Sequence, residues 1–392
     1  MNLIPANKGP SSTSLSRRTW LTTLSRSLIL SGTQVLSGGT FGRRAALWPQ
    51  TDRPLRVDES SAKVVPGTPG STEDAITPVG QFYLRNHHEE PKLTLASWKL
   101  KIEGKVARPL QLTFSDLLEA PVTKLEAVLE CAGNGATTGV LVACGYWEGA
   151  SLSHFLKQAA PEPNADRIML VGSDQGRLLE GETSYPYARI ASLEQGLSPE
   201  AMVAFRLNDQ FLPRRHGFPA RALFPGLYAM NSVKWLERVV VLGPQDWPAA
   251  FYSSGMDLLY VRTFNDPAAS SGTNRVSDVL IKSQIVSPAP GARIAAGPHA
   301  IWGFAWAGKH TVRSVQTSVD GGKHWQEAAL QGASRPFGWV KWSFAWQASR
   351  GEHALMCRAQ DSAGNWQPLE RDPNRRDGYE LNWCAPVNCS AR

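Results

Sequence analysis

The chain changes character at the segment Leu129-Glu130-Cys131-Ala132-Gly133-Asn134-Gly135, where an apolar run stops at a lone cysteine. Leu125, Ala127 and Leu129 recur at every second position, which predicts a half-buried strand that leads to Cys131. The glycines that follow predict an open turn, and a thiolate beside such a turn is a soft metal ligand. Taken alone, Cys131 is more typical of a small buried hydrophobe. The rest of the sequence has to decide between the two interpretations.

Length and composition predict a globular protein with more than one core. The 392 residues suffice for two domains, and a charged fraction of 19% with a hydrophobic fraction of 42% is typical of globular chains. The formal net charge is +7, but residues 1–51 hold six Lys and Arg and no acid. The remainder carries 7 − 6 = +1, so a nucleic-acid partner is not expected.

Residues 1–45 are predicted to be a leader. Arg17 and Arg18 precede a mildly apolar stretch, 21–36, which is interrupted by Arg26. The pair resembles a twin-arginine export signal and predicts a periplasmic protein, with a mitochondrial transit peptide as the alternative. The stretch is too short and too polar for a transmembrane helix, so stable membrane insertion is not expected. Residues 46–80 are rich in Pro, Gly and Ser and are expected to form a linker or an extended arm.

The region 81–265 is predicted to be an α+β domain. Short helix patterns at 112–119 and 151–157 are mixed with strand patterns and show no regular βαβ alternation. The predicted strands are 98–104, 125–129, 167–171, 201–207 and 233–242.

The region 276–392 has a different pattern, that of an all-β sandwich. Short alternating runs are separated by turn residues such as Asp320-Gly321-Gly322, and no helix pattern occurs there. The predicted strands include 301–306, 312–319, 342–346 and 354–359.

The five cysteines form no dense disulfide framework, and neither a CxxC pair nor a CxxCH haem-attachment motif occurs. Cys384 and Cys389 leave two possibilities open, a small loop disulfide or two separate thiols.

Three polar clusters accompany Cys131 in the first domain. They are Arg85-Asn86-His87, the basic run 214–221, and Ser232-Val233-Lys234. Taken singly, each has another explanation: a solvated surface, a basic loop that turns at a glycine, or a lysine that guards a strand edge. Together they predict a cationic pocket that contains one thiol and suits an anionic, phosphate-bearing ligand.

These motifs, in this order, resemble those of the sulfite oxidase family of molybdenum enzymes. The matching residues are 82–87, Glu130-Cys131-Ala132-Gly133-Asn134, 212–221, Pro225-Gly226 and 233–236. The resemblance extends from about Phe82 to the end of the sequence. It implies a molybdopterin-binding catalytic domain followed by an immunoglobulin-like dimerisation domain, and therefore a homodimer.

The resemblance also assigns roles to residues. Cys131 would be the protein ligand of molybdenum, whose other sulfur ligands come from the pyranopterin dithiolene of molybdopterin. Arg85 would in addition clamp the substrate, Trp147 would line the substrate pocket, and Tyr252 would act as the active-site tyrosine. The residues expected to hold the pterin and its phosphate are Arg85, Asn86, His87, Asp174, His216, Arg221, Ser232, Val233 and Lys234.

The implied reaction is oxidation of a sulfur oxyanion, sulfite first, by oxygen-atom transfer. Since no cytochrome b5-like haem segment occurs in the sequence, electrons are expected to pass to a separate acceptor such as a c-type cytochrome. Gly135 and Ala136 stand where family members carry two arginines. This departure keeps a sulfane-type sulfur dehydrogenase, or another oxide-transfer molybdoenzyme, as an alternative. A non-catalytic exported binding protein is the non-enzymatic alternative.

Overall fold

The computed structural model describes residues 64–65, 76–137, 140–178, 183–265 and 275–392. The predicted leader, 1–45, lies outside the described residues, as does most of the predicted arm, 46–80. Within that arm, the backbone of β1 (Val64–Val65) pairs antiparallel with β2 (Leu84–Arg85). Among the described residues, no helix is long and apolar enough to cross a membrane.

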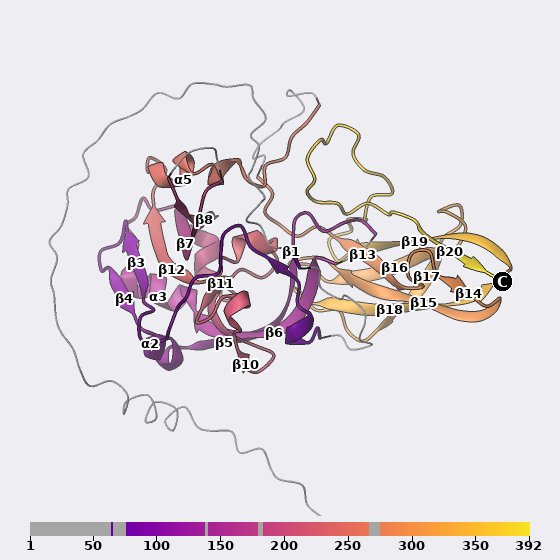
Figure 1. Cartoon of the computed structure of the whole chain (residues 1–392), viewed down its shortest axis with the longest axis horizontal. Coiled ribbons are helices and arrows are strands. Elements are labelled where there is room, and N and C mark those ends of the chain that lie inside the picture. The colour runs from indigo at the N-terminus through magenta and orange to yellow at the C-terminus, as the bar shows by residue number, and fades with distance from the viewer. Residues whose placement is uncertain (1–63, 66–75, 138–139, 179–182, 266–274) are drawn as a thin grey trace, which may run out of the picture. The chain divides into compact units, whose positions relative to one another are not determined.

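The strand that leads to Cys131 belongs to a five-stranded sheet (Figure 1). Its strands are β5 (Val122–Glu130), β6 (Val142–Ser151), β9 (Met202–Leu207), β10 (Gln210–Phe211) and β11 (Arg221–Leu223). β5 and β6 pair antiparallel over the whole of β5, from Val122 opposite Ala150 to Glu130 opposite Val142. Cys131 is therefore the first residue beyond the paired strand.

A second five-stranded sheet has the order β4-β3-β12-β7-β8. Its strands are β3 (Leu100–Gly104), β4 (Leu110–Leu112), β7 (Arg167–Gly176), β8 (Tyr185–Ser192) and β12 (Leu236–Leu242). The prediction that β12 begins at Val233 is wrong, because Trp235 adopts a left-handed backbone conformation with φ 52° and breaks the ladder. Lys234 consequently lies in a loop rather than at a strand edge.

The helices of this part of the chain are all short. They are α2 (Phe114–Glu119), α3 (Leu152–Ala159), α4 (Leu193–Leu197) and α5 (Ala249–Ser253), with 3-10 turns η2 (Val79–Gln81), η3 (Arg214–His216), η4 (Ala229–Asn231) and η5 (Met256–Leu258). Thr113 and Asp116 form the capping box that begins α2, and Ser151 caps α3. The fold is thus mostly strand with a few short helices.

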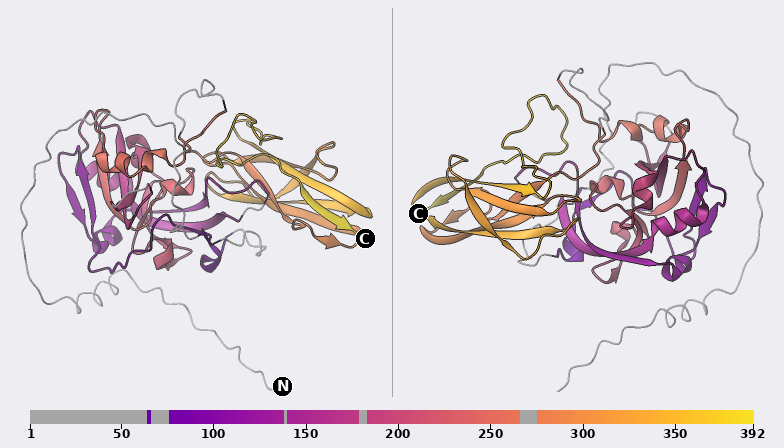
Figure 2. Two further views of the ribbon diagram at one scale, coloured as in Figure 1. Left: turned by 45° about the horizontal axis from the view of Figure 1, so that its top comes forward. Right: turned by 180° about the vertical axis from the view of Figure 1, so that it is seen from behind.

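The C-terminal residues form an all-β region. Its strands are β13 (Lys282–Ser287), β14 (Arg293–Ile294), β15 (Gly297–Trp306), β16 (Val312–Ser318), β17 (Gln326–Gln331), β18 (Trp339–Ala348), β19 (Gly351–Asp361) and β20 (Val387–Ala391). They form one hydrogen-bonded path, β13-β15-β18-β17-β16-β19-β20-β14, and lie side by side in both views of Figure 2. Ile301, Val315, Trp342 and Leu355 share one apolar core, so the path folds back on itself. The immunoglobulin-like arrangement of these strands stays a prediction.

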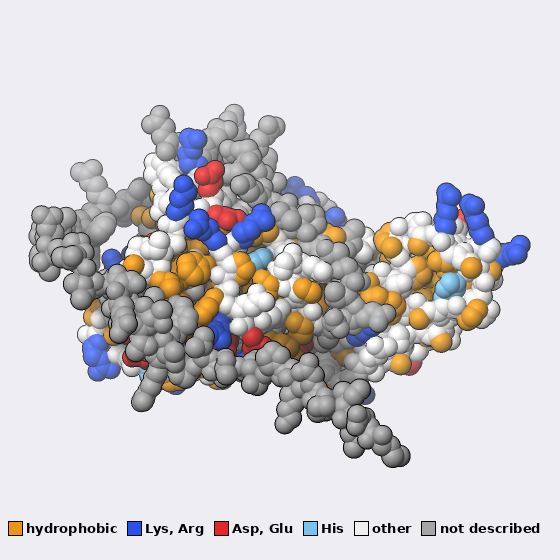
Figure 3. All heavy atoms as spheres, turned by 60° about the horizontal axis from the view of Figure 1, so that its bottom comes forward, with side chains coloured by type: hydrophobic (Ala, Val, Ile, Leu, Met, Phe, Trp, Pro, Cys, Tyr) orange, Lys and Arg blue, Asp and Glu red, His pale blue; other side chains and the backbone are white. Residues whose placement is uncertain are grey.

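The surface and the cysteines agree with simple expectations from the sequence. On the face drawn in Figure 3, basic and acidic side chains lie intermixed among apolar ones, as a nearly neutral body predicts. All five cysteines are separate thiols, so the structure takes the second of the two possibilities for Cys384 and Cys389.

Candidate cofactor site

A cavity between the loops of the first region brings most of the predicted site residues together. The predicted residues that line it are Arg85, Asn86, His87, Cys131, Asp174, His216, Arg221, Ser232, Val233 and Lys234. They come from β2 and the loop after it, the end of β5, β7, η3, β11 and the loop before β12. Residues as far apart as Arg85 and Lys234, 149 positions in sequence, thus meet at one site.

Lys234 fastens two of the loops that form the cavity. Its ammonium donates hydrogen bonds to the backbone oxygens of Arg85 (3.2 Å) and Arg215 (3.3 Å) and to Oδ1 of Asn86. The three acceptors are neutral oxygens. Burial lowers the pKa of Lys234 to about 7, and the nearby Arg221 guanidinium acts in the same direction. An anion bound in the cavity would stabilise the charged form of Lys234 and offset the free-energy cost of burying it.

Arg221 is a second buried cation of the site. Its Nη2 donates to the backbone oxygen of Ser232 (2.6 Å), and its Nη1 donates to that of His216 (3.2 Å). Burial lowers its pKa to about 10. The guanidinium lies 5.4 Å from the ring centre of Trp147, which is buried in the core beneath the cavity and does not line it. Trp147 therefore supports a cavity residue instead of forming the predicted wall.

Both histidines of the site are held neutral near pH 7. Burial and the Arg85 charge hold the pKa of His87 well below its usual value, and burial with the Lys234 charge lowers that of His216 to about 3. The His87 ring stacks on Tyr187 at 4.7 Å, and its Nε2 lies 2.9 Å from the hydroxyl of Tyr260. These rings offer a flat surface and neutral hydrogen-bonding groups.

Cys131 lies half-buried at the edge of the cavity. Its backbone N–H donates to Leu141 (2.9 Å), and its backbone oxygen accepts from Asn134 (2.8 Å), so the turn is closed on both sides. Burial raises the pKa of the thiol, while a backbone hydrogen bond at Gly133 and the Arg85 charge oppose that rise. Among the described residues, no group of three or more His, Cys, Asp or Glu is placed to hold a metal ion. A metal bound at Cys131 would therefore need ligands that come from a cofactor.

The predicted active-site tyrosine does not line the cavity. Tyr252 lies on α5, where its ring packs 5.3 Å from that of Trp247. Tyr260 lines the cavity instead, with the Arg189 guanidinium 5.2 Å from its ring centre. Its backbone is left-handed, with φ 60°, a strained conformation for a bulky residue that is often found at functional sites. No sequence pattern marked Tyr260, because it lies outside the motifs of the family resemblance, between Pro225-Gly226 and 233–236 on one side and the C-terminal strands on the other.

Three buried polar atoms of the cavity have no hydrogen-bond partner among the described residues. They are the hydroxyl of Tyr83, Oδ1 of Asp174 and Nε of Arg221. An unpaired buried polar group costs about 1–3 kcal/mol, so such groups are rare unless a ligand satisfies them. Unpaired polar atoms, an excess of cations and one thiol fit an anionic cofactor that is rich in polar edges and carries a soft metal.

Comparison with known proteins leads to the same cofactor. Residues 87–247 match the family model of the oxidoreductase molybdopterin binding domain, and residues 273–376 match that of the Mo-co oxidoreductase dimerisation domain. The sulfite oxidase of Gallus gallus is 31% identical over 327 residues, which cover 76% of this chain and 69% of that protein. This chain belongs to the sulfite oxidase family of molybdopterin-dependent oxidoreductases.

Two further proteins show how far the similarity extends, one in the length that is matched and one in the substrate that is named. The mitochondrial sulfite oxidase of Mus musculus is 32% identical over 328 residues, but the match spans only 58% of its length. The sulfane dehydrogenase SoxCD from Paracoccus pantotrophus has a similar structure, with a TM-score of 0.70 and 27% identity over 80% of this chain and 81% of that one. The sulfite oxidase family fold is therefore shared with proteins whose names give different sulfur substrates.

The two positions that depart from the sulfite oxidase family pattern are held by the C-terminal β region. The backbone oxygen of Gly135 accepts hydrogen bonds from Lys282 (3.1 Å) and Gln284 (2.7 Å), and that of Ala136 accepts from Gln284 (3.4 Å). Neither residue has a side chain that reaches a substrate. The cations that line the cavity are thus Arg85, Arg221 and Lys234 among the described residues.

Proposed function

We propose that this chain oxidises a small inorganic sulfur compound at a molybdopterin cofactor, with sulfite as the first candidate. The observation that carries the proposal is the presence of the Cys131 thiol and three cationic side chains in one cavity. A thiolate suits a soft, redox-active metal, and the cations suit both a cofactor phosphate and an oxyanion substrate. Conversion of sulfite and water to sulfate releases two electrons and two protons. A separate acceptor such as a c-type cytochrome would take up the electrons, and the protons would pass to the solvent.

The predicted cofactor residues that line the cavity each have a role in this proposal. When bound, the cofactor supplies oxygen-atom transfer and two-electron redox chemistry. Cys131 would bind the metal through its thiolate, and Lys234 and Arg221 would neutralise the phosphate. Asn86, His87, Asp174, His216 and Ser232 would form the remaining polar wall, and Val233 would contribute an apolar contact. The unpaired Oδ1 of Asp174 and Nε of Arg221 would then gain partners.

Arg85 and Tyr260 are the residues proposed to meet the substrate. The Arg85 charge opposes the rise that burial causes in the pKa of the Cys131 thiol, so Arg85 lies close to Cys131 and its charge would orient an oxyanion beside the metal. Burial raises the pKa of Tyr260 well above its usual value, so its hydroxyl keeps its proton and can donate it in a hydrogen bond to the oxyanion. His87 contacts that hydroxyl at 2.9 Å and would fix its direction.

A sulfane-type substrate, a reduced sulfur atom carried by another protein, is the second candidate. The absence of side-chain charge at Gly135 and Ala136 favours it, because one of the two arginines that they replace would face the substrate, and a dianion such as sulfite would lose that cationic contact. The structural similarity to sulfane dehydrogenase SoxCD supports it as well. The remaining proposals are export through the predicted leader and a homodimer, the latter supported by the match of 273–376 to a dimerisation domain.

Turnover by the metal-loaded full chain distinguishes these functions. The protein is made in cells that synthesise molybdopterin, its molybdenum content is measured, and cytochrome c reduction is followed with sulfite, thiosulfate and a protein persulfide. About one molybdenum per chain and rapid turnover with sulfite are expected. Turnover with the persulfide alone would select the second candidate. A fully folded protein with no molybdenum would refute the enzymatic proposal and leave a binding protein.

A further inference from the structure

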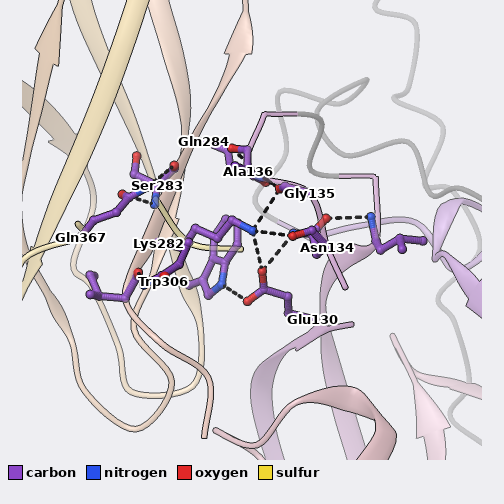
Figure 4. Close-up of polar contacts among 12 residues, drawn as sticks. Glu130, Asn134, Gly135, Ala136, Lys282, Ser283, Gln284, Trp306 and Gln367 are labelled. Carbon is purple, nitrogen blue, oxygen red and sulfur yellow. Dashed lines mark hydrogen bonds and ion pairs between the residues drawn. The ribbon is translucent and has the colours of Figure 1, made fainter. Parts of the chain in front are cut away.

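A buried ion pair joins the C-terminal β region to the residue that precedes Cys131. Glu130 ends β5 and Lys282 begins β13, and their charged groups lie 3.0 Å apart with side chains only 2% and 1% exposed (Figure 4). Trp306, on β15, donates its Nε1–H to the other carboxylate oxygen at 2.8 Å. Both oxygens of Glu130 are therefore held by side chains from the C-terminal β region.

The same lysine also holds the turn that follows Cys131. Its ammonium donates to the backbone oxygens of Asn134 (3.0 Å) and Gly135 (3.1 Å), and Gln284 donates to Gly135 at 2.7 Å (Figure 4). The Asn134 amide closes the arrangement, since it donates to Glu130 (3.0 Å) and accepts from the backbone of Leu141 (3.1 Å). We call Glu130, Lys282, Gln284 and Trp306 the clamp.

A second contact holds the middle of the turn. The backbone N–H of Glu380 donates to the oxygen of Ala132 at 2.8 Å. Glu380 is itself fixed by two hydrogen bonds from Arg262, at 2.7 and 2.6 Å, and one from Arg375 at 3.0 Å. The turn that carries Cys131 is thus held from two sides. The clamp holds one side, and the segment around Glu380, which is bound by Arg262 and Arg375, holds the other.

Stability alone does not explain a fully buried Lys–Glu pair. Removing two charges from water costs several kcal/mol per ion, and well-packed apolar residues of similar volume are often as stable or more so. The pair does, however, define a geometry that apolar packing cannot, since one ammonium fixes three oxygens on both sides of Cys131. Groups that hold a metal ligand from behind set its orientation and tune the metal.

We propose that Lys282, together with Trp306 and Gln284, is a positioning residue of the metal site. It fixes the turn after Glu130 so that the Cys131 thiolate enters the cavity in one orientation. The C-terminal β region is then a structural part of the site, in addition to any role in dimerisation. This inference rests on the proposed role of Cys131 as the metal ligand.

The test uses Lys282→Met, the double variant Glu130→Gln/Lys282→Met, and Trp306→Phe in the full chain. The double variant leaves no charge at this buried pair, and Trp306→Phe keeps an aromatic ring while it removes the hydrogen bond to Glu130, so at least one of the three is expected to fold. Lys124→Met is the matched control, because Lys124 lies on the same strand as Glu130 but is bound at the surface to Asp209 and Glu148.

Two measurements report thiolate orientation independently of turnover. One is the rate of Cys131 alkylation in the cofactor-free protein, where the other four cysteines are buried. The other is the Mo(V) electron paramagnetic resonance spectrum of the loaded protein. Folded clamp variants should show faster alkylation, shifted spectra, and kcat lowered about 10- to 100-fold with little change in KM, while Lys124→Met matches the wild type.

Wild-type alkylation rates and spectra in a folded clamp variant would overturn the inference and make the clamp a purely structural contact. Failure of the wild-type protein to bind molybdenum would instead refute the proposed function, and the alkylation rates would still decide whether the clamp orients the thiol.

Discussion

Cys131 is the residue on which the proposed chemistry depends most directly. Cys131→Ser is nearly isosteric, so the fold should persist, but a hydroxyl is a poor ligand for a soft metal. We expect turnover to be abolished and the molybdenum content to fall, with an unchanged urea unfolding midpoint. Metal analysis and steady-state assays on the purified variant measure this. Full activity in Cys131→Ser would contradict the assignment.

The two tyrosines separate a sequence-based prediction from a structural one. Tyr260 lines the cavity and contacts His87 at 2.9 Å, whereas Tyr252 packs against Trp247 on α5. We expect Tyr260→Phe to lower kcat about 100-fold, the order of loss when one preorganised hydrogen-bond donor to the reacting oxyanion is removed. Tyr252→Phe should leave kcat unchanged. Steady-state kinetics of the two variants measure this. A lowered kcat in Tyr252→Phe alone would reverse the assignment.

Asp174 makes the stability of the cofactor-free protein depend on pH. Burial raises the pKa of its carboxyl to about 7 in the folded chain, against about 3.9 in an unfolded one. Below the unfolded pKa the carboxyl is neutral in both the folded and the unfolded state, so burying it does not yet reduce the free energy of unfolding. As the pH rises towards 7 only the unfolded chain ionises, so stability is lost across that window and the loss ends once the folded carboxyl ionises.

Asp174→Asn removes this titration, although Lys234 still faces the site. We expect the variant to exceed the wild type in unfolding free energy at pH 8 by a few kcal/mol, since one pKa unit corresponds to about 1.4 kcal/mol. The two proteins should converge near pH 4. Urea denaturation of both cofactor-free proteins across this range checks the prediction, and parallel pH profiles would contradict it.

At the scale of elements, Arg189 holds the segment that presents Tyr260. It is buried, and its Nη1 donates to the backbone oxygens of Met256 (3.3 Å) and Leu259 (3.4 Å) on and beside η5. Arg189→Lys keeps the charge but loses the fork of donors. We expect faster hydrogen exchange of the 256–260 amides, lower kcat, and a stability loss of about 1–3 kcal/mol from the unpaired carbonyls.

Arg206→Lys is the matched control for that variant, because Arg206 lies 4.6 Å from the ring centre of Phe211 and outside the cavity lining. Its amide exchange near η5 and its kcat should equal those of the wild type. Equal exchange in the Arg189 variant would show that η5 is held by other contacts.

Local patterns predicted the elements well where the signal was local. The short helix pattern at 112–119, where α2 forms, and the two-residue alternation before Cys131 both lie within a few residues of the structure they determine. The break at Trp235 was not predictable in this way, because its left-handed conformation follows from how β12 enters the sheet. Apolar runs cannot reveal such a turn.

Contacts between segments that are distant in sequence could not be predicted. Motifs located the cavity residues, but nothing in the sequence linked Glu130 to Lys282, which are 152 positions apart. Tyr260 and Arg189 were missed for the same reason, since their importance arises only when η5 packs beside the cavity. The residue types of a site can thus be read from motifs, while the groups that position them require the fold.

At the scale of the whole molecule, the cavity is a concentration of positive charge inside a nearly neutral body. Arg85, Arg221 and Lys234 line it, and Asp174 is the one carboxylate among the described lining residues, with a pKa raised to about 7. Like charges held together in a buried site oppose folding. A ligand that binds only the folded state stabilises it by mass action, and the gain is about 2.7 kcal/mol when its concentration is 100 times Kd.

Inorganic phosphate should therefore raise the Tm of the cofactor-free protein above its value in sodium chloride of equal ionic strength. The stabilisation should saturate with phosphate concentration, as binding does, whereas screening depends on ionic strength alone and is the same in both salts. Lys234→Met should lose most of the effect because it removes a cavity cation. Arg238→Met should retain it, since Arg238 is paired with Glu103 on the neighbouring strand β3. Equal Tm values in the two salts would show that the cavity cations do not form an anion site.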